Sequence, residues 1–414
     1  MWSRWLDVER TTVLPRLLAA MALLGWLLSQ AMGPGAFDVS GEPVGADFLA
    51  LWTGARLALT GNDPLDFAAQ HALQVAELGP AVRLHAWVSP PWTAVLLSPW
   101  AALPYLTALA AWWGATFLAW LLSLRALSRD LNPGRGPEGI TLALCFFPTL
   151  AAGFYGQATP LWTALIAVGV VLWRRSRSFA AGLVLATLVL KPQLLLPAVA
   201  WGLGRRDLPL LGGLTVGCAL WIGISELLVP GGTVNWLERV PDIAAMLRSD
   251  AYPVWGHVSA LGWWTNPLHG LAPSLVDPLV TATGLGLAGA STWLAMRAGD
   301  DRRSAQSDRH FAAALAVGLM ALPHLYLYDL GILVVPLALA ANGTASHRDR
   351  PLDGGRFLVA TAALWLATFA GPYVTLAMDG ASRAWFGFPA ALCVVFPVVL
   401  GWAWVAVTPS QAER

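Results

Sequence analysis

The stretch FLVATAALWLATFA, residues 357–370, places apolar side chains one after another, without alternation between apolar and polar positions. The stretch ITLALCFFPTL, residues 140–150, has the same character. Strands of a membrane barrel alternate over about ten residues, so neither stretch fits a barrel. A lipid-embedded segment outside a barrel satisfies its backbone polar groups only as a helix. Both stretches therefore predict helices inside a membrane.

The composition extends this prediction to the whole chain. Hydrophobic residues make up 57% of the 414 residues and charged residues 12%, whereas a soluble domain carries roughly 25% charged residues. Further long apolar runs are separated by short clusters of Arg, Asp, Gly and Pro. A helix needs about 20 apolar residues to cross the hydrocarbon layer, so we expect an all-α polytopic transmembrane helical bundle with about 10–13 spans. Residues 1–414 then form a single integral membrane domain.

The composition also limits the partners and cofactors. The net charge of +1 argues against nucleic acid as a partner. Cys145, Cys218 and Cys393 all lie inside apolar runs, which predicts packed thiols, with no disulfide and no metal site. The sequence contains no HExxH, CxxC, Walker or GxSxG motif, so zinc, nucleotide and serine-hydrolase chemistry have no support. The 23 tryptophans suit a protein with many membrane interfaces.

The first apolar run, residues 13–32, suggests how the chain is oriented. Arg4, Arg10 and Arg16 lie at its leading side, which predicts a cytoplasmic N-terminus in a multi-pass plasma-membrane protein. A signal peptide begins in the same way, and Ser29-Gln30-Ala31 offers a small-x-small cleavage site. The run is longer than the apolar region of most signal peptides, so we favour an uncleaved helix.

Two large polar loops follow on the predicted outer side, residues 33–87 and 230–270. Within the first, residues 47–59 carry an apolar stripe at helical spacing, and the turn signal Gly61-Asn62-Asp63-Pro64 precedes a second short helix. This pattern predicts two amphipathic helices lying on the outer membrane surface.

Arginine clusters define the predicted inner side. Placing all of them in the cytoplasm leaves one conflict, because residues 88–124 look like a two-pass hairpin yet must cross an odd number of times. Either one piece is re-entrant or the cluster at Arg125 lies outside. The clusters occupy residues 125–135, 174–177, 205–206, 297–309 and 348–356.

Several polar residues on the predicted outer side are candidates for chemistry, and each also has a structural interpretation. Asp47 opens an amphipathic helix, where a carboxylate is also a good N-cap. Lys191 is the one lysine of the chain and lies within LVLKPQ, where a charge marks function or reaches the interface. Residues 323–329, PHLYLYD, contain four polar side chains at the junction of a span and need partners or water. That segment is either part of a site or a structural network.

Short motifs follow one another in a fixed order over about residues 45–335. They are GADFLALWTGAR at 45–56, LTGNDPLD at 59–66, VSPP at 88–91, LSP at 97–99, GQ at 156–157, AG at 181–182, LKP at 190–192, PH at 323–324 and YDL at 328–330. The order of these motifs resembles that of glycosyltransferase family 87, a family of polyprenyl-phosphate-mannose-dependent mannosyltransferases with the class C membrane fold. The resemblance implies an inverting enzyme without a cofactor beyond its lipid-linked donor, in which an outer-loop aspartate, here Asp47, is the general base.

The resemblance thus implies a membrane hexosyltransferase, with mannose favoured, that moves a sugar from a polyprenyl phosphate to an acceptor glycolipid or glycan on the outer face. A polytopic transporter or flippase is the alternative, but no internal repeat supports it. The residues expected to bind the donor phosphate or the substrate are Lys191, His324, Arg56, His257, Gln157, Tyr328 and Asp329.

Overall fold

The computed structural model describes residues 8–131, 138–246, 257–268, 272–345, 359–369 and 395–408. Within these residues the chain is helical, and the extended pairings are two isolated bridges, Phe37 with Pro43 and His257 with Tyr326. The prediction of an all-α polytopic helical membrane protein is confirmed.

The helices follow one another with short connections. In chain order they are α1 (Val8–Met32), α2 (Ala46–Leu59), α3 (Phe67–Leu78), α4 (Trp92–Ala101), α5 (Tyr105–Leu131), α6 (Glu138–Leu144), α7 (Phe147–Tyr155), α8 (Thr159–Arg174), α9 (Ser178–Ala186), η2 (Thr187–Leu190), η3 (Pro192–Leu194), α10 (Leu195–Gly204), α11 (Leu208–Leu228), α12 (Gly232–Met246), α13 (Ala260–Leu268), η5 (Pro273–Leu275), α14 (Val276–Arg297), α15 (Ala305–Met320), η6 (Leu327–Leu333), α16 (Val334–Ala345), a helix over 359–369 and α18 (Val395–Val407).

Among the described residues, four helices are long and apolar enough to cross a membrane: Val13–Met32, Tyr105–Leu131, Leu208–Leu228 and Pro273–Arg297. Shorter apolar helices of 10–17 residues accompany them. The number of spans, which the sequence puts at about 10–13, stays a prediction.

The conflict at residues 88–124 has a physical explanation in the length of α4. With 10 residues, α4 is about 15 Å long, half the thickness of the hydrocarbon layer. Trp92 donates its indole N–H to the carbonyl of Val189 (2.6 Å), and Thr93 donates its hydroxyl to that of Leu190 (2.9 Å). These bonds hold α4 inside the bundle beside another interrupted segment. Of α4 and α5, only α5 is long enough to cross.

That second interruption lies at Lys191. Proline disfavours helical geometry in the preceding residue and removes one backbone donor, and Lys191 accordingly has φ −130° and ψ 80° before Pro192. The mostly apolar stretch at residues 179–203 is therefore broken into α9, η2, η3 and α10. Lys191 lies at the break, inside the protein, and its ammonium is paired with a buried carboxylate.

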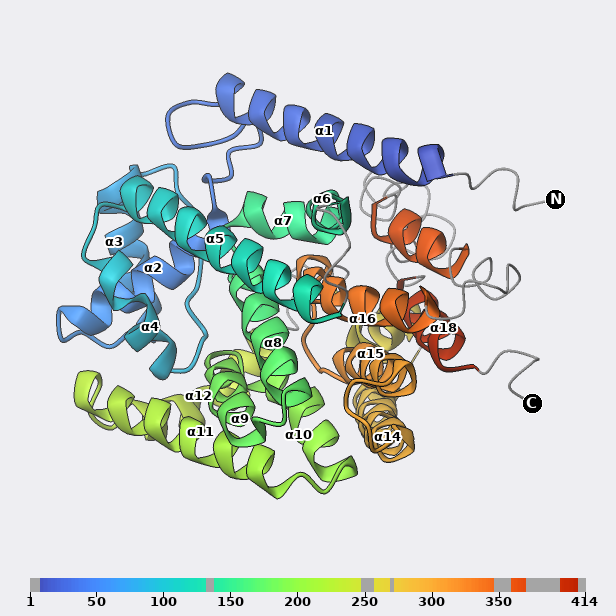
Figure 1. Cartoon of the computed structure of the whole chain (residues 1–414). Helices are drawn as coiled ribbons and strands as arrows, with labels where there is room; N and C mark the ends of the chain where they lie inside the picture. The colour runs from blue at the N-terminus through green and yellow to red at the C-terminus, as the bar shows by residue number, and fades with distance from the viewer. Residues whose placement is uncertain are drawn as a thin grey trace.

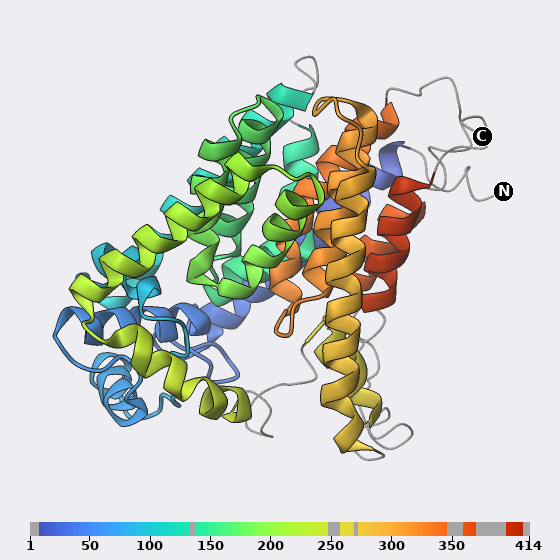
Figure 2. The same cartoon turned by 90° about the horizontal axis from the view of Figure 1, so that it is seen from below.

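The helices form one bundle (Figures 1 and 2). Its two ends differ, because short helices gather at one end and buried ion pairs lie away from them. Figure 2 shows α2, α3 and α4 in blue beside α12 in yellow-green at the lower end. Away from them, Arg174 donates to Asp130 over 2.8 Å and pairs with Asp308, with all three side chains almost fully buried. These pairs join α5, α8 and α15 where the predicted inner arginine clusters begin.

Tryptophans also fill the core of the bundle, since Trp52, Trp112 and Trp120 are fully buried. The expectation that tryptophans lie at the membrane interface therefore does not describe these three.

Candidate active site

Asp47 lies in the first turn of α2, but it does not cap that helix. The N-cap is Gly45, in the left-handed conformation with φ 69°, and no side-chain cap is present. Asp66 shows the contrast, because its carboxylate accepts the backbone N–H groups of Ala68 (2.9 Å) and Ala69 (3.1 Å) at the start of α3. The N-cap interpretation of Asp47 is therefore wrong, and its carboxylate points to other partners.

Those partners come from two distant loops. The side-chain amide of Gln157 donates to Oδ2 of Asp47 over 2.6 Å. The hydroxyl of Tyr328 also forms a hydrogen bond with the Asp47 carboxylate. The residue as a whole is half-buried, and one side of its carboxylate is held by these two neutral donors.

Two glycine turns make this contact possible. Gly45 precedes α2, and Gly156 ends α7 with φ 69°, a conformation that glycine adopts without strain. A Cβ on Gly156 would lie 2.7 Å from Cβ of Phe48 and 3.4 Å from Cα of Gly45. The two backbones therefore approach so closely that the residues following them, Asp47 and Gln157, meet.

One face of α5 supports both turns. The Tyr105 hydroxyl lies 2.5 Å from the carbonyl oxygen of Val44 and 3.0 Å from that of Gly45, and it donates to this pair. Seven residues later, the indole N–H of Trp112 donates to the carbonyl of Gly156 over 3.0 Å. The ring of Phe48 stacks on both aromatic side chains, with centroids 6.1 Å from Tyr105 and 5.6 Å from Trp112. The sequence analysis missed both residues, because tryptophan and tyrosine in an apolar helix carry no motif.

Lys191 and Asp329 form an ion pair beside Asp47. Their Nζ and Oδ1 atoms are 2.5 Å apart, and the side chain of Asp329 is fully buried, whereas that of Lys191 is 18% exposed. Asp329 also accepts the backbone N–H of Tyr326 over 3.1 Å, and the Thr159 hydroxyl lies 3.5 Å from its Oδ1. The carboxylate is thus fixed on several sides, and it fixes the ammonium in turn.

Two histidines complete the cluster. The ring of His257 lies 4.6 Å from that of His324 and 4.3 Å from that of Tyr326, between centroids. The neighbouring Val258 donates its N–H to the carbonyl of Leu325 over 2.9 Å, which joins the two segments. His257 is fully buried, and neither of its ring nitrogens has a hydrogen-bond partner within the described part of the chain.

The electrostatics distinguish the carboxylate from the histidines. Burial raises the pKa of Asp47 to about 6, and nearby Asp329 adds to the rise, against the lowering effects of Gln157 and Lys191. Burial and the positive charge of Lys191 lower the pKa of His324 to about 3, and burial and His324 lower that of His257 to about 2. At neutral pH the site therefore offers an ionised carboxylate and two neutral imidazoles.

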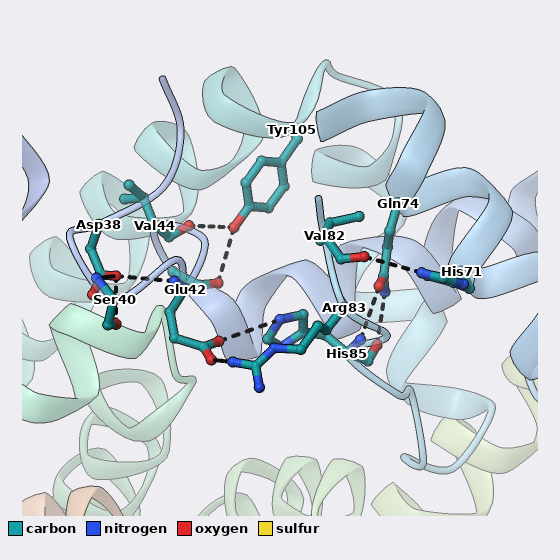
Figure 3. A network of polar contacts seen from close by, with 11 residues as sticks. Asp38, Ser40, Glu42, Val44, His71, Gln74, Val82, Arg83, His85 and Tyr105 are labelled. Atoms are coloured by element: carbon teal, nitrogen blue, oxygen red, sulfur yellow. Dashed lines mark hydrogen bonds and ion pairs between the residues drawn. The ribbon is translucent and has the colours of Figure 1, made fainter. Parts of the chain in front are cut away.

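The loop before α2 is held by its own polar network (Figure 3). Glu42 pairs with Arg83, and its other oxygen lies 3.6 Å from Nε2 of His85. Gln74 bonds the backbone of His85 in both directions, at 2.8 Å and 2.9 Å. Figure 3 also shows the Tyr105 hydroxyl reaching the chain just before Asp47. These bonds tie the loop to α3 and α5 and fix the start of α2.

Of the residues expected to bind substrate, Arg56 is the one that lies apart. Arg56 is nine positions along α2 from Asp47, about 13 Å at the rise of an α-helix. Its guanidinium donates to the carbonyl of Ala101 over 2.8 Å at the end of α4. The structure brings the others to one region, namely Gln157, Lys191, His257, His324, Tyr328 and Asp329 around Asp47.

The helical membrane fold and a match to a known family together define a membrane glycosyltransferase. The model of glycosyltransferase family 87 matches residues 87–323, more than half of the chain, and the chain belongs to that family. The match includes Gln157, Lys191 and His257, begins after Asp47 and ends just before His324. No curated protein and no solved structure matches the chain.

Proposed function

We propose that this glycosyltransferase moves a hexose, with mannose favoured, from a polyprenyl phosphate to a hydroxyl group of an acceptor glycolipid or glycan on the outer face of the plasma membrane. One observation carries the proposal. The half-buried carboxylate of Asp47 has its pKa raised to about 6 and lies in one cluster with the Lys191–Asp329 ion pair. A base of this kind beside a positive charge is what sugar transfer with a phosphate leaving group needs.

In the proposed reaction the acceptor oxygen attacks the anomeric carbon from the side opposite the phosphate. Asp47 takes the hydroxyl proton as the new carbon–oxygen bond forms. The bond between the anomeric carbon and the phosphate oxygen breaks, and its electron pair stays on the polyprenyl phosphate. The anomeric configuration is therefore inverted, and no nucleotide or other cofactor takes part.

The other residues bind or position in this proposal. Lys191 stabilises the charge on the leaving phosphate, and Asp329 orients its ammonium. His324 and His257, both neutral, are donors for phosphate or sugar oxygens. Gln157 and Tyr328 hold the Asp47 carboxylate, which restricts it to a productive orientation.

A lipid-linked donor suits the surroundings of the site. The prenyl chain stays among the apolar helices while the sugar phosphate reaches the polar loops at the end of the bundle. Arg56, bound to the carbonyl of Ala101, has no part in the proposed chemistry. Its contact instead ties α2 to α4.

The test is transfer by the purified protein in lipid nanodiscs, with a panel of radiolabelled polyprenyl-phosphate sugars and membrane glycolipid acceptors. We expect a product whose anomeric configuration is opposite to that of the donor. Asp66→Asn, which changes a helix-capping carboxylate outside the cluster, is the matched control and should remain active. Movement of lipid-linked sugar across proteoliposomes without any glycosidic product would instead favour the flippase alternative.

A further inference from the structure

The outer end of α11 continues into α12 through a rigid turn. Glu226, near the end of α11, accepts the backbone N–H of Gly231 (2.7 Å) and of Thr233 (3.0 Å), and it also pairs with the Thr233 hydroxyl. The carboxylate thereby satisfies donors at the start of α12 that have no partner in the helix. Figure 2 shows α12 turning back from the lower end of α11.

One face of α12 is bound to the outer loop that carries Asp47. Asn235 and Arg239 donate to Oδ2 of Asp63 at 3.3 Å and 3.1 Å. The indole N–H of Trp236 donates to the carbonyl of Val88 over 3.2 Å, and its ring lies 5.5 Å from that of Trp92. This face is fully occupied by protein contacts.

The opposite face is apolar and exposed. Val234 is 60% exposed and Leu237 56% exposed. Pro241 follows at the next helical turn and is also exposed. Glu238 and Asp242 border this arc on one side only, where both are exposed. A helix with an apolar arc, an acidic edge and a polar face bound to protein is suited to the boundary between water and lipid.

Exposed apolar side chains also lie on α11, just before the turn. Leu220, Ile224 and Leu227 are 56%, 48% and 83% exposed, on a helix that is long and apolar enough to cross a membrane. Leu227 and Val234 lie on either side of the turn that Glu226 fixes. Exposed apolar residues therefore lie on both sides of a fixed connection, on α12 and on the end of a candidate membrane-spanning helix.

We propose that α12 lies in the outer lipid surface, with Val234, Leu237 and Pro241 at the level between headgroups and acyl chains and with Glu238 and Asp242 toward water. Because Arg239 holds Asp63, this helix fixes the depth of the outer loop, and hence of Asp47, relative to the membrane. The occupant of the exposed face is the lipid itself.

The test uses full-length protein in nanodiscs of phosphatidylethanolamine and phosphatidylglycerol. The native cysteines are first replaced by serine. Leu237→Cys and, as the matched control, Glu238→Cys are then introduced separately, and each new cysteine is labelled with an environment-sensitive fluorophore. We expect the probe at 237 to be quenched by lipids that carry a nitroxide near the headgroup end of the acyl chain. The probe at 238 should be quenched by iodide.

Two outcomes would overturn the proposal. Quenching of the 237 probe by iodide but not by nitroxide lipid would place this face in water. Protection from both quenchers would mean that protein covers this face of α12. Cross-linking between cysteines at position 237 would then identify a second copy as the cover. Without cross-linking, the cover would be another part of this chain.

The unmodified chain provides an independent measurement where the cysteine-free variant fails to fold. A phospholipid with a photoactivatable acyl chain should form adducts at Val234, Leu237 or Pro241 and none at Asn235 or Arg239. Labelling of α11 without any labelling of α12 would contradict the proposal.

Discussion

The side-chain amide of Gln157 lies 2.6 Å from Oδ2 of Asp47, although the two residues are 110 positions apart in the sequence. Their meeting depends on two left-handed glycines and on α5, which bonds the backbone at both. The carboxylate is half-buried, which is costly for a charge, and its raised pKa reflects that cost. A carboxylate kept ionisable in such surroundings is characteristic of a functional site.

Asp47→Asn is expected to remove transfer without unfolding the protein. Asparagine keeps the size of the side chain but cannot take a proton, and a general base typically contributes about 10²–10⁴-fold to the rate. Turnover should therefore fall at least about 100-fold, while donor binding is retained. Because Gly45, not Asp47, is the N-cap, the change removes no capping bond. Turnover and melting temperature of the purified variant check both expectations, and near-normal turnover would exclude Asp47 as the base.

Melting temperatures at several pH values provide a control for the same variant. A carboxyl group whose pKa is raised in the folded state stabilises the fold below its unfolded pKa, and that contribution is lost as the pH rises through about 6. The melting temperature of Asp47→Asn relative to the wild type should therefore increase from pH 4 to pH 7. A constant difference would mean that Asp47 titrates normally.

The pH profile of kcat/KM is expected to fall on the acid side with an apparent pKa of about 6. The base must be unprotonated to act, so activity is present above this pH and decreases about tenfold per pH unit below it. His257 and His324 have lowered pKa values and stay neutral through this range. A profile that is flat down to pH 4.5 would contradict the assignment.

Variants of the Lys191–Asp329 pair separate two effects of the Lys191 charge, its effect on sugar transfer and its effect on folding. Lys191→Met should abolish measurable transfer and also lower the melting temperature, because removing one partner of a buried pair costs about 3–5 kcal/mol. Lys191→Met combined with Asp329→Asn removes the unpaired charge, so the melting temperature should recover while transfer does not. Recovery of transfer in the double variant would show that the Lys191 charge is not needed.

The side of the membrane on which the site lies is tested by cysteine labelling in intact cells. Ser40 precedes α2 in the loop predicted to lie outside and Ser176 follows α8 beside the arginine cluster, and both are exposed. A membrane-impermeant thiol reagent should modify Ser40→Cys and leave Ser176→Cys unmodified until the membrane is permeabilised. Modification of position 176 from outside would reverse the predicted orientation.

The helical class could be predicted from sequence because consecutive apolar residues such as those at 140–150 leave a membrane segment few alternatives. Motif order was equally informative, since the resemblance that named the family also named Asp47, Gln157 and Lys191 together. These features are local in the chain. They require no knowledge of how helices pack.

The features that sequence could not supply depend on packing. The place of α4 inside the bundle depends on its bonds to the carbonyls of Val189 and Leu190, which lie about a hundred residues away. Arg56 belongs to the same motif as Asp47, yet the helix carries it about 13 Å away. Tyr105 and Trp112 act through carbonyl groups of distant loops, and no sequence pattern marks a donor to a backbone oxygen.

The support that α5 gives to the site leads to the last prediction. Tyr105→Phe and Trp112→Phe each keep an aromatic ring but remove the donor to the Val44 and Gly45 carbonyls or to the Gly156 carbonyl. A single neutral hydrogen bond contributes about 1 kcal/mol, so both variants should fold. If these bonds position Asp47 and Gln157, kcat should fall about 10-fold or more while KM for the donor stays unchanged, since a small misplacement of reacting groups is costly. Trp402→Phe, which removes an indole bond to Thr361, is the matched control, because no contact among the described residues joins either of them to the cluster around Asp47. A purely structural role would instead lower the melting temperature in all three variants and leave kcat of the folded fraction unchanged.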